Sequence, residues 1–297
     1  TGCTILSFII EALALLKPSP AHIRSIDAIL CSYSGNTAHY FQQFQQGLSE
    51  SGTEVYVHRF EHHNTFNTDL HGDALVIVFR VFGWKMPWPL LEYLLLHLPR
   101  GNSKPAYIVY TAGGGPENAG FVAWVLLTLK GYRVLGKAWS IYPINIATVR
   151  LGPKRFWKWF DRLFPFRIEE EHAQWAGRAF AQGRSAGMPI LLWPFPLFII
   201  GTLLENPIIN RIYHHYVWKR RCTRCGLCIR YCPSRRLYKS DNGYPRAKGV
   251  CILCLRCINI CPTNAMHVLG FSEYGTPYPP KWPDLALPKS SSVKRDA

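Results

Sequence analysis

Acidic residues are scarce in this 297-residue chain: 18 Asp and Glu stand against 34 Lys and Arg, which gives a net charge of +16. Charged residues of both signs make up only 18%, whereas hydrophobic residues make up 48%. This composition excludes a disordered, highly charged polymer and indicates a globular protein with a substantial core. The length is enough for a large domain followed by a small one.

The sequence also lacks a secretory signal and a long, unbroken hydrophobic span. Residues 4–16 are apolar, but no basic segment precedes them and they contain Glu11, so we expect a short helix there. Residues 188–204 carry no charge, but they number only 17 and contain prolines at 189, 194 and 196. Prolines interrupt the helical hydrogen bonds that a membrane span needs. We therefore expect a buried connector, with an interfacial membrane contact as the alternative.

Cysteine is almost absent outside one region. Eight of the ten cysteines lie between residues 222 and 261, and the other two are Cys3 and Cys31. This distribution does not suit a disulfide scaffold and favours a reducing compartment. The region reads C-x2-C-x2-C-x3-C-P twice; its cysteines are Cys222, Cys225, Cys228 and Cys232, then Cys251, Cys254, Cys257 and Cys261.

This duplicated run resembles that of bacterial two-cluster ferredoxins, in which the fourth cysteine of each copy binds the other cluster. The resemblance implies one 4Fe–4S cluster held by Cys222, Cys225, Cys228 and Cys261, and a second held by Cys251, Cys254, Cys257 and Cys232. Two zinc sites and a disulfide framework are the alternatives. Zinc sites usually pair their ligands and often include histidine, and disulfides need no duplicated spacing.

The chain from residue 25 onward alternates between strand and helix patterns. Short apolar runs predict five strands, at 26–31, 54–60, 73–79, 106–110 and 134–141. Helical spacings follow at 38–48, 117–130 and 169–182. This alternation predicts an α/β fold with a doubly wound, five-stranded parallel sheet, in which ligands bind beyond the carboxyl ends of the strands.

The loop after the first strand has the composition of an anion site. It reads Ser32-Tyr33-Ser34-Gly35-Asn36-Thr37 and leads directly into a helix, whose N-terminal N–H groups favour a phosphate. It is neither a Walker loop nor a Gly-x-Gly-x-x-Gly fingerprint. An ordinary polar turn is the alternative.

Ser-x-Ser-Gly-Asn-Thr is similar to the phosphate loop of flavodoxins, and this resemblance implies an FMN site. Its phosphate ligands would come from Ser32, Ser34, Gly35, Asn36 and Thr37. Aromatic residues after the third strand suit a flat flavin ring, and a glycine-rich loop after the fourth lets the main chain approach it. These candidates are Phe82, Gly83, Trp84 and Trp88, then Thr111, Gly113, Gly114 and Gly115. Packing under the sheet and a flexible turn are the alternatives for these two loops.

Over about residues 25–145 and 207–269 the chain resembles a family of fused electron carriers, with a flavodoxin-like part first and a two-cluster ferredoxin last. The stretch Gly-Trp-Lys-Met-Pro-Trp-Pro at 83–89 and the cysteine repeats carry this resemblance. One departure is Arg80, which stands after the third strand where many members of that family have proline, so it either pairs with the flavin or fills its site. The expected parts are an N-terminal helix or extension at 1–24, a flavodoxin-like domain at 25–186, an apolar, helical connector at 187–218, a ferredoxin domain with two 4Fe–4S clusters at 219–270, and a Pro-rich tail at 271–297.

These patterns predict a cytoplasmic electron-transfer protein that acts as partner or subunit of a larger redox enzyme. A peripheral contact with the inner face of a membrane is the option that the apolar connector leaves open. Between residues 205 and 261, twelve Lys and Arg stand against two acidic residues, which suits a redox partner with an acidic docking surface. Basic and aromatic residues also alternate at 152–166, but no nucleic-acid recognition motif accompanies them. A flavin-free electron wire in a membrane-associated complex and a flavin reductase with its own small substrate are the alternatives.

Overall fold

The computed structural model describes residues 22–61, 66, 69–81, 86–112, 117–142, 169–187 and 215–268. The chain divides into two compact units, one built around a large sheet and one around the cysteine repeats. The expected N-terminal helix, the apolar connector from 188 onward, the basic segment at 152–166 and the Pro-rich tail lie outside the described residues.

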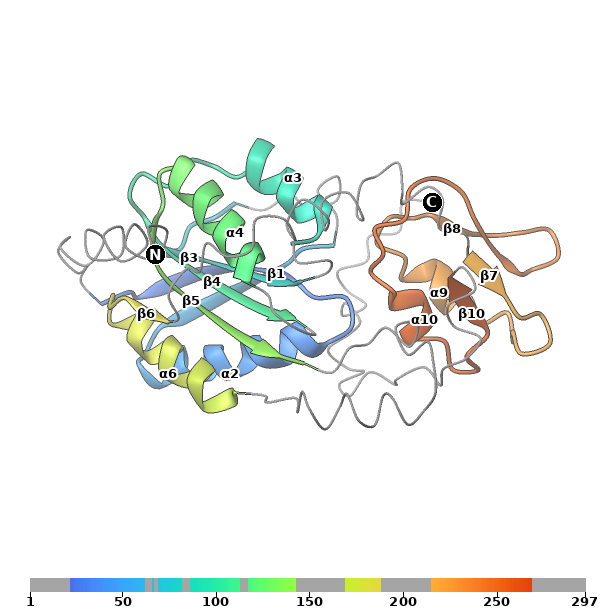
Figure 1. Ribbon diagram of the computed structural model, residues 1–297, viewed down its shortest axis with the longest axis horizontal. Coiled ribbons are helices and arrows are strands. Elements are labelled where there is room, and N and C mark those ends of the chain that lie inside the picture. The colour runs from blue at the N-terminus through green and yellow to red at the C-terminus, as the bar shows by residue number, and fades with distance from the viewer. Residues whose placement is uncertain are drawn as a thin grey trace, which may run out of the picture. The chain divides into compact units, whose positions relative to one another are not determined.

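The first unit is a parallel α/β sheet, and its predicted architecture is confirmed (Figure 1). The strand order is β2-β1-β3-β4-β5-β6, with every neighbouring pair parallel. Its first five strands follow the flavodoxin order 2-1-3-4-5. The elements are β1 (Ser25–Cys31), α2 (Asn36–Glu50), β2 (Glu54–Arg59), β3 (Ala74–Arg80), α3 (Trp88–Leu96), β4 (Pro105–Ala112), α4 (Glu117–Leu129), β5 (Arg133–Ile141), α6 (Glu170–Ala181) and β6 (Ala186–Gly187).

The central strands are continuous apolar runs because helices cover both faces of the sheet. Six of the seven residues in β1 and in β3 are buried, and so are seven of the eight in β4. The edge strand β2 is largely exposed or half-buried, as expected where one side has no neighbouring strand. Helices α2 and α6 cover one face, and α3 and α4 cover the other (Figure 1).

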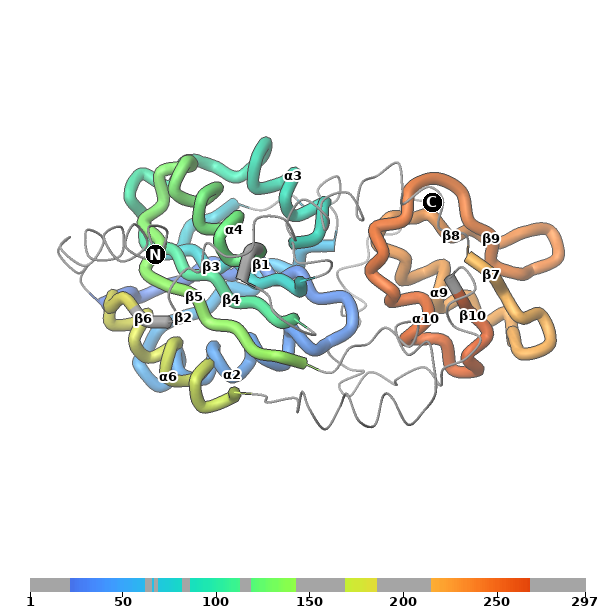
Figure 2. The backbone as a smooth tube through the Cα atoms, in the orientation of Figure 1, coloured from blue at the N-terminus to red at the C-terminus, as the bar shows by residue number. Residues whose placement is uncertain are grey.

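Helices α2 and α6 pack closely because each places a glycine at their contact (Figure 2). A Cβ atom added to Gly177 would overlap sterically with the Phe44 carbonyl oxygen, and one added to Gly47 would overlap with the Gln174 carbonyl oxygen. Under this contact, the Phe44 ring stacks on Tyr107 of β4 with centroids 5.1 Å apart. The two glycines thus let the helices seat their aromatic side chains on the sheet.

Two elements of this unit differ from the sequence-based expectation. Trp88, expected in a flavin-binding loop, is the first residue of α3 and is 40% exposed. The Pro87-Trp88-Pro89 sequence explains the helix start, since proline is tolerated in a first turn whose N–H groups have no helical partner. Strand β6, Ala186–Gly187, adds a two-residue sixth strand beside β5, where five strands were expected.

The described part of the second unit, residues 215–268, contains two short antiparallel strand pairs and two single-turn helices. Strand β7 (His215–Val217) pairs with β10 (Met266–Val268), and β8 (Leu237–Lys239) pairs with β9 (Pro245–Ala247). Helices α9 (Leu227–Arg230) and α10 (Arg256–Asn259) lie between them. This unit therefore begins at or before β7, ahead of the expected boundary at 219.

The backbone of the second unit repeats itself with a shift of 29 residues. Three positions of the first copy have positive φ, namely Arg224 (59°), Gly226 (74°) and Arg235 (50°). Their equivalents 29 residues later, Leu253 (48°), Leu255 (57°) and Asn264 (51°), have it too. Non-glycine residues in this region are uncommon and strained, so the paired occurrence shows that the turns themselves are required.

No helix in the described ranges is both long and apolar enough to cross a lipid bilayer.

The contact between α2 and α6 predicts that Gly177→Ala destabilises the first unit. Alanine favours a helix by about 1 kcal/mol over glycine, but here its methyl group would overlap the Phe44 carbonyl, and overpacking of this kind costs about 1–3 kcal/mol. We expect a lower midpoint in urea unfolding. Gln42→Ala, at an exposed position on α2, should change the midpoint little; an equally stable Gly177→Ala protein would contradict the close contact.

The left-handed turn at Gly226 predicts that Gly226→Ala lowers the melting temperature by backbone strain alone. No atom lies within 4 Å of the added methyl group, so steric overlap is absent. The strain of about 1 kcal/mol corresponds to a shift of about 4 °C or more for a domain of this size. Thr223→Ala, at a neighbouring exposed position, serves as the control. Equal melting temperatures of the Gly226→Ala and Thr223→Ala proteins would argue against backbone strain at Gly226.

Candidate functional site

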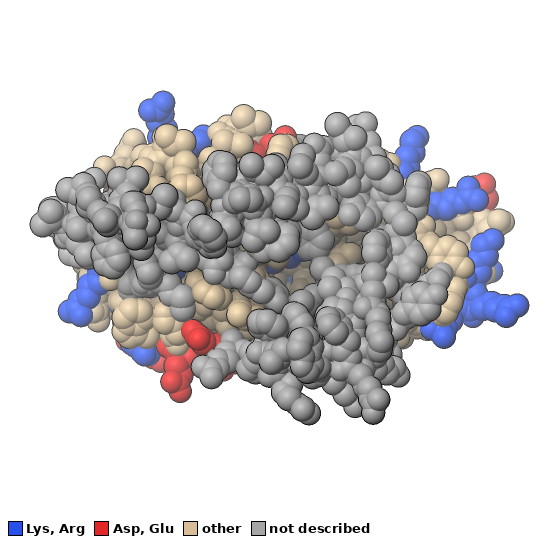
Figure 3. All heavy atoms as spheres, viewed as in Figure 1, with Lys and Arg blue, Asp and Glu red and all other residues tan. Residues whose placement is uncertain are grey.

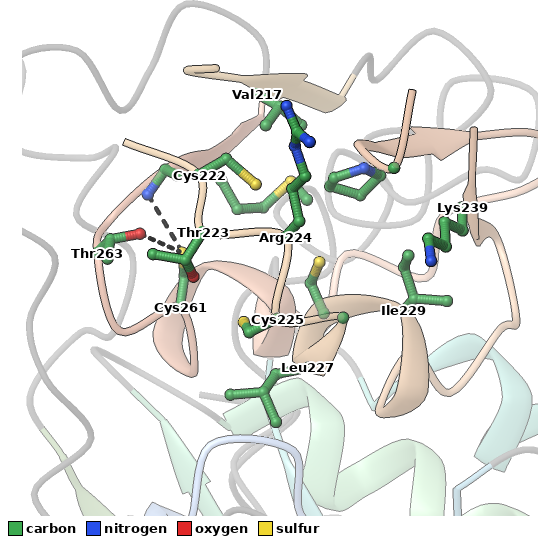
Figure 4. Close-up of a pocket in the computed structure, with 16 residues that line it drawn as sticks. Val217, Cys222, Thr223, Arg224, Cys225, Leu227, Ile229, Lys239, Cys261 and Thr263 are labelled. Atoms are coloured by element: carbon green, nitrogen blue, oxygen red, sulfur yellow. Dashed lines mark hydrogen bonds between the residues drawn. The ribbon is translucent and has the colours of Figure 1, made fainter. Parts of the chain in front are cut away.

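The cysteines of the second unit surround two separate cavities. Cys222, Cys225, Cys228 and Cys261 line the first, which also contacts Arg224 and Lys239 (Figure 4). Cys232, Cys251, Cys254 and Cys257 line the second. Each cavity therefore combines three cysteines of one copy with the fourth cysteine of the other, which is the grouping expected from the ferredoxin resemblance.

The thiols line each cavity and do not meet at one point. Within the described part of the chain, no three Cys, His, Asp or Glu side chains are arranged to hold a single metal ion. The nine cysteines described there are also free of disulfides. In a 4Fe–4S cluster the four thiolates bind a multi-iron core, so ligands spread around a cavity suit such a group.

Hydrogen-bond donors point at several of these sulfur atoms. The Ala265 N–H donates to Cys261 Sγ at 3.2 Å, and the Leu253 N–H donates to Cys251 Sγ at 3.4 Å. At equivalent places in the two copies, a hydroxyl lies near the fourth cysteine: Ser234 Oγ is 3.6 Å from Cys232 Sγ, and Thr263 Oγ1 is 3.9 Å from Cys261 Sγ. Donors of this kind stabilise negative charge on sulfur and tune cluster potentials.

Burial keeps several of the thiols protonated in the absence of iron. Desolvation, followed by the neighbouring thiols, raises the pKa of Cys228 to about 11. Desolvation likewise raises the pKa of Cys254 to about 12 and that of Cys257 well above its ordinary value. Such thiols become ligands only when a metal displaces the proton, so the cavities fit a metal centre better than a reactive free cysteine.

The first unit places several polar side chains at the carboxyl edge of its sheet. Ser32 follows β1, and its Oγ accepts a hydrogen bond from the Ala38 N–H of α2 at 3.2 Å. The hydroxyls of Thr37 and Thr111 lie 2.7 Å apart and are buried. Residues 74 positions apart in the chain thus meet where a parallel sheet binds its ligands.

The backbone of the phosphate loop suits an anion, but the hydroxyls of Ser32 and Thr37 already make hydrogen bonds within the chain. Gly35 has φ of 92°, which glycine alone adopts easily, and α2 begins at Asn36, one residue later. The loop therefore leads directly into the N-terminus of a 15-residue helix, the end of a helix that favours an anion. Ser34 and Asn36 belong to this same turn, whereas Phe82, Gly83, Trp84, Gly113, Gly114 and Gly115 lie outside the described residues.

Arg80 ends β3 and is the register partner of Thr111 on β4. It is half-buried at the same edge as the phosphate loop. This position is compatible with both roles expected for Arg80, a partner for the flavin and an occupant of its place.

Sequence reasoning missed a group of three polar side chains at the end of β5. His39 Nδ1 lies 2.8 Å from the Tyr142 hydroxyl, and His39 Nε2 lies 3.8 Å from Glu170. Desolvation, assisted by Glu170 and Tyr40, raises the pKa of Tyr142, which therefore stays protonated. The three residues come from different elements, so no local motif could have indicated their contact.

Comparison with known families supports the reading of the second unit. Residues 214–262 match the 4Fe-4S dicluster domain family. No curated protein matches the chain.

The solved structures that resemble the chain include flavodoxins and a related oxidoreductase. A flavodoxin from the domain Archaea is 15% identical, with 54% of this chain and 96% of that one covered and a TM-score of 0.38. The two-electron reduced flavodoxin of Megasphaera elsdenii is 15% identical, with 52% and 98% covered and a TM-score of 0.38. The NAD(P)H:quinone oxidoreductase of Methanothermobacter marburgensis is 15% identical, with 54% and 100% covered and a TM-score of 0.34.

The fold of the first unit is defined by its own strand order, independently of these distant likenesses. The second unit combines the family match with the eight-cysteine repeat, and such domains transfer electrons through 4Fe–4S clusters. The chain thus joins a flavodoxin-like domain to a ferredoxin-type domain, whose residues 214–262 match the 4Fe-4S dicluster domain model.

Proposed function

We propose that the chain transfers electrons through two 4Fe–4S clusters, coupled to an FMN in the flavodoxin-like domain, as a partner or subunit of a larger redox enzyme. The observation that carries this proposal is the sorting of eight cysteines around two cavities, four to each. The exchange of Cys232 and Cys261 between the two copies supports two clusters over one, because each cavity then has a complete ligand set.

The roles of the chain's own residues follow from their positions. The eight cysteines act as thiolate ligands, and the N–H groups of Leu253 and Ala265 stabilise charge on their sulfur atoms. When bound, the clusters exchange single electrons, and a flavin exchanges one or two. The chain orients these groups and shields them, and it needs no nucleophile of its own.

The FMN part of the proposal rests on the loop from Ser32 to Thr37. Its polar composition, the positive φ of Gly35 and the start of α2 at Asn36 suit a phosphate. The two hydroxyls of the Thr37–Thr111 pair share one hydrogen between them, which leaves one O–H available to a ligand at this edge.

A flavin-free electron wire in a membrane-associated complex is the second candidate, and specific observations favour it. Ser32 already caps an N–H of α2, and Arg80 stands at the same sheet edge. On another face, Leu96 at the end of α3 is 68% exposed and Leu129 at the end of α4 is 78% exposed. Exposed leucines on otherwise apolar helices suit a protein partner or a lipid surface.

The proposed partner is a redox protein with an acidic docking surface in a hetero-oligomer, and the proposed place is the cytoplasm, near the inner face of a membrane. Eleven Lys and Arg stand against one acidic residue, Asp241, within 215–268. Such a surface attracts acidic proteins and raises their association rate.

The ligand sets predict that cysteine substitutions combine in a specific way. Cys232→Ala with Cys251→Ala removes two ligands of one proposed cluster, so the purified protein should keep about half of its iron and sulfide. Cys222→Ala with Cys251→Ala removes one ligand from each, so both clusters should be lost or strongly depleted. Iron and acid-labile sulfide analysis after anaerobic purification makes the comparison.

Cys31→Ala is the matched control, since this buried cysteine of β1 lies in neither cavity and should keep the full iron content. Equal iron loss in the two double variants would refute the exchange of the fourth cysteine between copies. Zinc in place of iron and sulfide would refute the clusters themselves.

The phosphate loop predicts that FMN binds to the flavin-depleted protein and that Thr37→Val weakens this binding. A hydrogen bond to a charged group contributes about 1.5–3 kcal/mol, so we expect a loss of about tenfold or more in affinity. Quenching of FMN fluorescence on titration measures it. Riboflavin, which lacks the phosphate, should bind equally to both proteins.

Thr53→Val is the matched control, because Thr53 is a buried threonine whose hydroxyl donates to the Ile23 carbonyl, outside the loop. It loses one buried hydrogen bond and should keep FMN affinity. A protein that is purified without flavin and does not bind added FMN would favour the flavin-free wire.

A further inference from the structure

The two copies of the cysteine repeat share their backbone turns but differ in the side chain that directly precedes the second cysteine. In the first copy this residue is Arg224, which is exposed; in the second it is Leu253, which is 3% exposed. Both have positive φ, so the backbone turn is the same and the difference lies in chemistry alone. The first copy therefore presents charge where the second presents an apolar surface.

Two cationic side chains border the first cavity. Arg224 and Lys239 both line it together with Cys225, whose side chain is exposed (Figure 4). A Cβ atom on Gly243, in the turn between β8 and β9, would lie 3.2 Å from Arg224 Cδ and 3.9 Å from Lys239 Cε. The Arg224 and Lys239 side chains thus both run close to Gly243, and both line the same cavity as the exposed Cys225.

Tyr244 holds Arg224 in this place. The Arg224 Nη2 donates a hydrogen bond to the Tyr244 hydroxyl at 3.0 Å, and its guanidinium carbon lies 4.5 Å from the centroid of the same ring. Lys219 Nζ lies 5.7 Å from that centroid. A cation ordered in advance loses less side-chain entropy when it meets an anion, so this arrangement favours binding. We call Lys219, Arg224 and Lys239 the cationic rim.

The surface around the rim has little acidic charge to neutralise it. Within the described residues 215–268, nine Lys and Arg are exposed, against one exposed acidic residue, Asp241. Figure 3 shows blue spheres projecting on the right of the view, with little red among them. The rim therefore lies within a positive field that extends over the unit.

We infer that the cationic rim is the docking surface through which this chain exchanges electrons with an acidic redox protein. The inference rests on the proposed function and specifies which cavity faces the partner. One electron passes in each encounter: one protein is oxidised and the other reduced, while no bond breaks and no proton moves in this chain. A nucleic acid would meet the charge requirement but carries no redox centre to bring near Cys225.

Binding of an acidic probe tests the surface without reference to electron transfer. Labelled poly-L-glutamate is titrated into the holoprotein, and fluorescence anisotropy reports its affinity. The double variant Arg224→Gln with Lys239→Gln should weaken binding by about tenfold, because each exposed pair contributes up to about 1 kcal/mol. The Tyr244→Phe protein, which keeps the ring but loses the hydrogen bond, should fall between it and the wild type.

Arg246→Gln with Lys248→Gln is the matched control. Both residues are exposed and belong to the same hairpin region, but neither lines the first cavity, and the change in net charge is the same. Weakening of equal size in the two double variants would overturn the rim as a specific surface. Tighter binding of an oligothymidylate than of poly-L-glutamate, with loss on the same rim variant, would overturn it in favour of a nucleic acid.

The rate of electron exchange with small charged oxidants tests the position of the rim relative to the redox centre. Wild-type protein, reduced anaerobically, should react with the anion tris(oxalato)cobaltate(III) more slowly as ionic strength rises, and with the cation hexaamminecobalt(III) more quickly. In the Arg224→Gln, Lys239→Gln protein, both rates should depend less on ionic strength. In the Arg246→Gln, Lys248→Gln protein, they should depend on it as in the wild type. The opposite signs in the wild type would overturn the inference.

These outcomes separate the inference from the proposed function. A protein that carries iron and sulfide and reacts with both oxidants at rates independent of the rim keeps the proposed function and loses the rim. A protein without iron and sulfide loses the proposed function, although its binding of poly-L-glutamate can still be measured. The iron content and visible spectrum of each variant establish that the fold is intact before its affinity is interpreted.

Discussion

The structure of the ferredoxin-type domain depends on one constraint: four thiols from two separate stretches of chain must surround each cavity. Cys232 lines the cavity of the second copy and Cys261 that of the first, so neither copy is complete alone. Three left-handed positions in each copy turn the chain around its cavity. The strands β8 and β10 then bring Leu237 and Met266 into a shared core with Cys257. The cost of the strained turns is offset by burial and by the ligands they position.

The two copies have the same backbone turns but different side chains, so the two cavities differ in nearby charge and in solvent exposure. The first is bordered by Arg224 and Lys239 and includes an exposed cysteine, whereas the second includes the buried Cys251 and Cys257. Solvent exposure and nearby charge are among the factors that set cluster potentials, so the two centres are expected to differ in potential. The proposed partner surface therefore lies beside the first cavity alone, although the backbone turns of the two copies are alike.

The flavodoxin-like domain contributes an edge at which distant segments converge. The ends of β1, β3 and β4 bring Ser32, Arg80 and Thr111 to the same side of the sheet, as the parallel arrangement requires. The glycines of α2 and α6 allow the helices to pack closely on one face. The result is a fixed platform for the loop that begins α2. Two of the hydroxyls at this edge, those of Thr37 and Thr111, already form a hydrogen bond with each other.

The sequence by itself determined the parallel sheet, because continuous apolar runs such as 74–79 require burial on both faces. It also determined which cysteines are candidate ligands, because their repeated spacing is that of ferredoxin ligands. Only the tertiary structure decided which cations stand beside the first cavity, that Thr37 meets Thr111, and that Trp88 begins a helix. Local periodicity reports which face of an element is buried. It does not report contacts between residues far apart in the chain, which depend on how elements pack, and these contacts built both candidate sites.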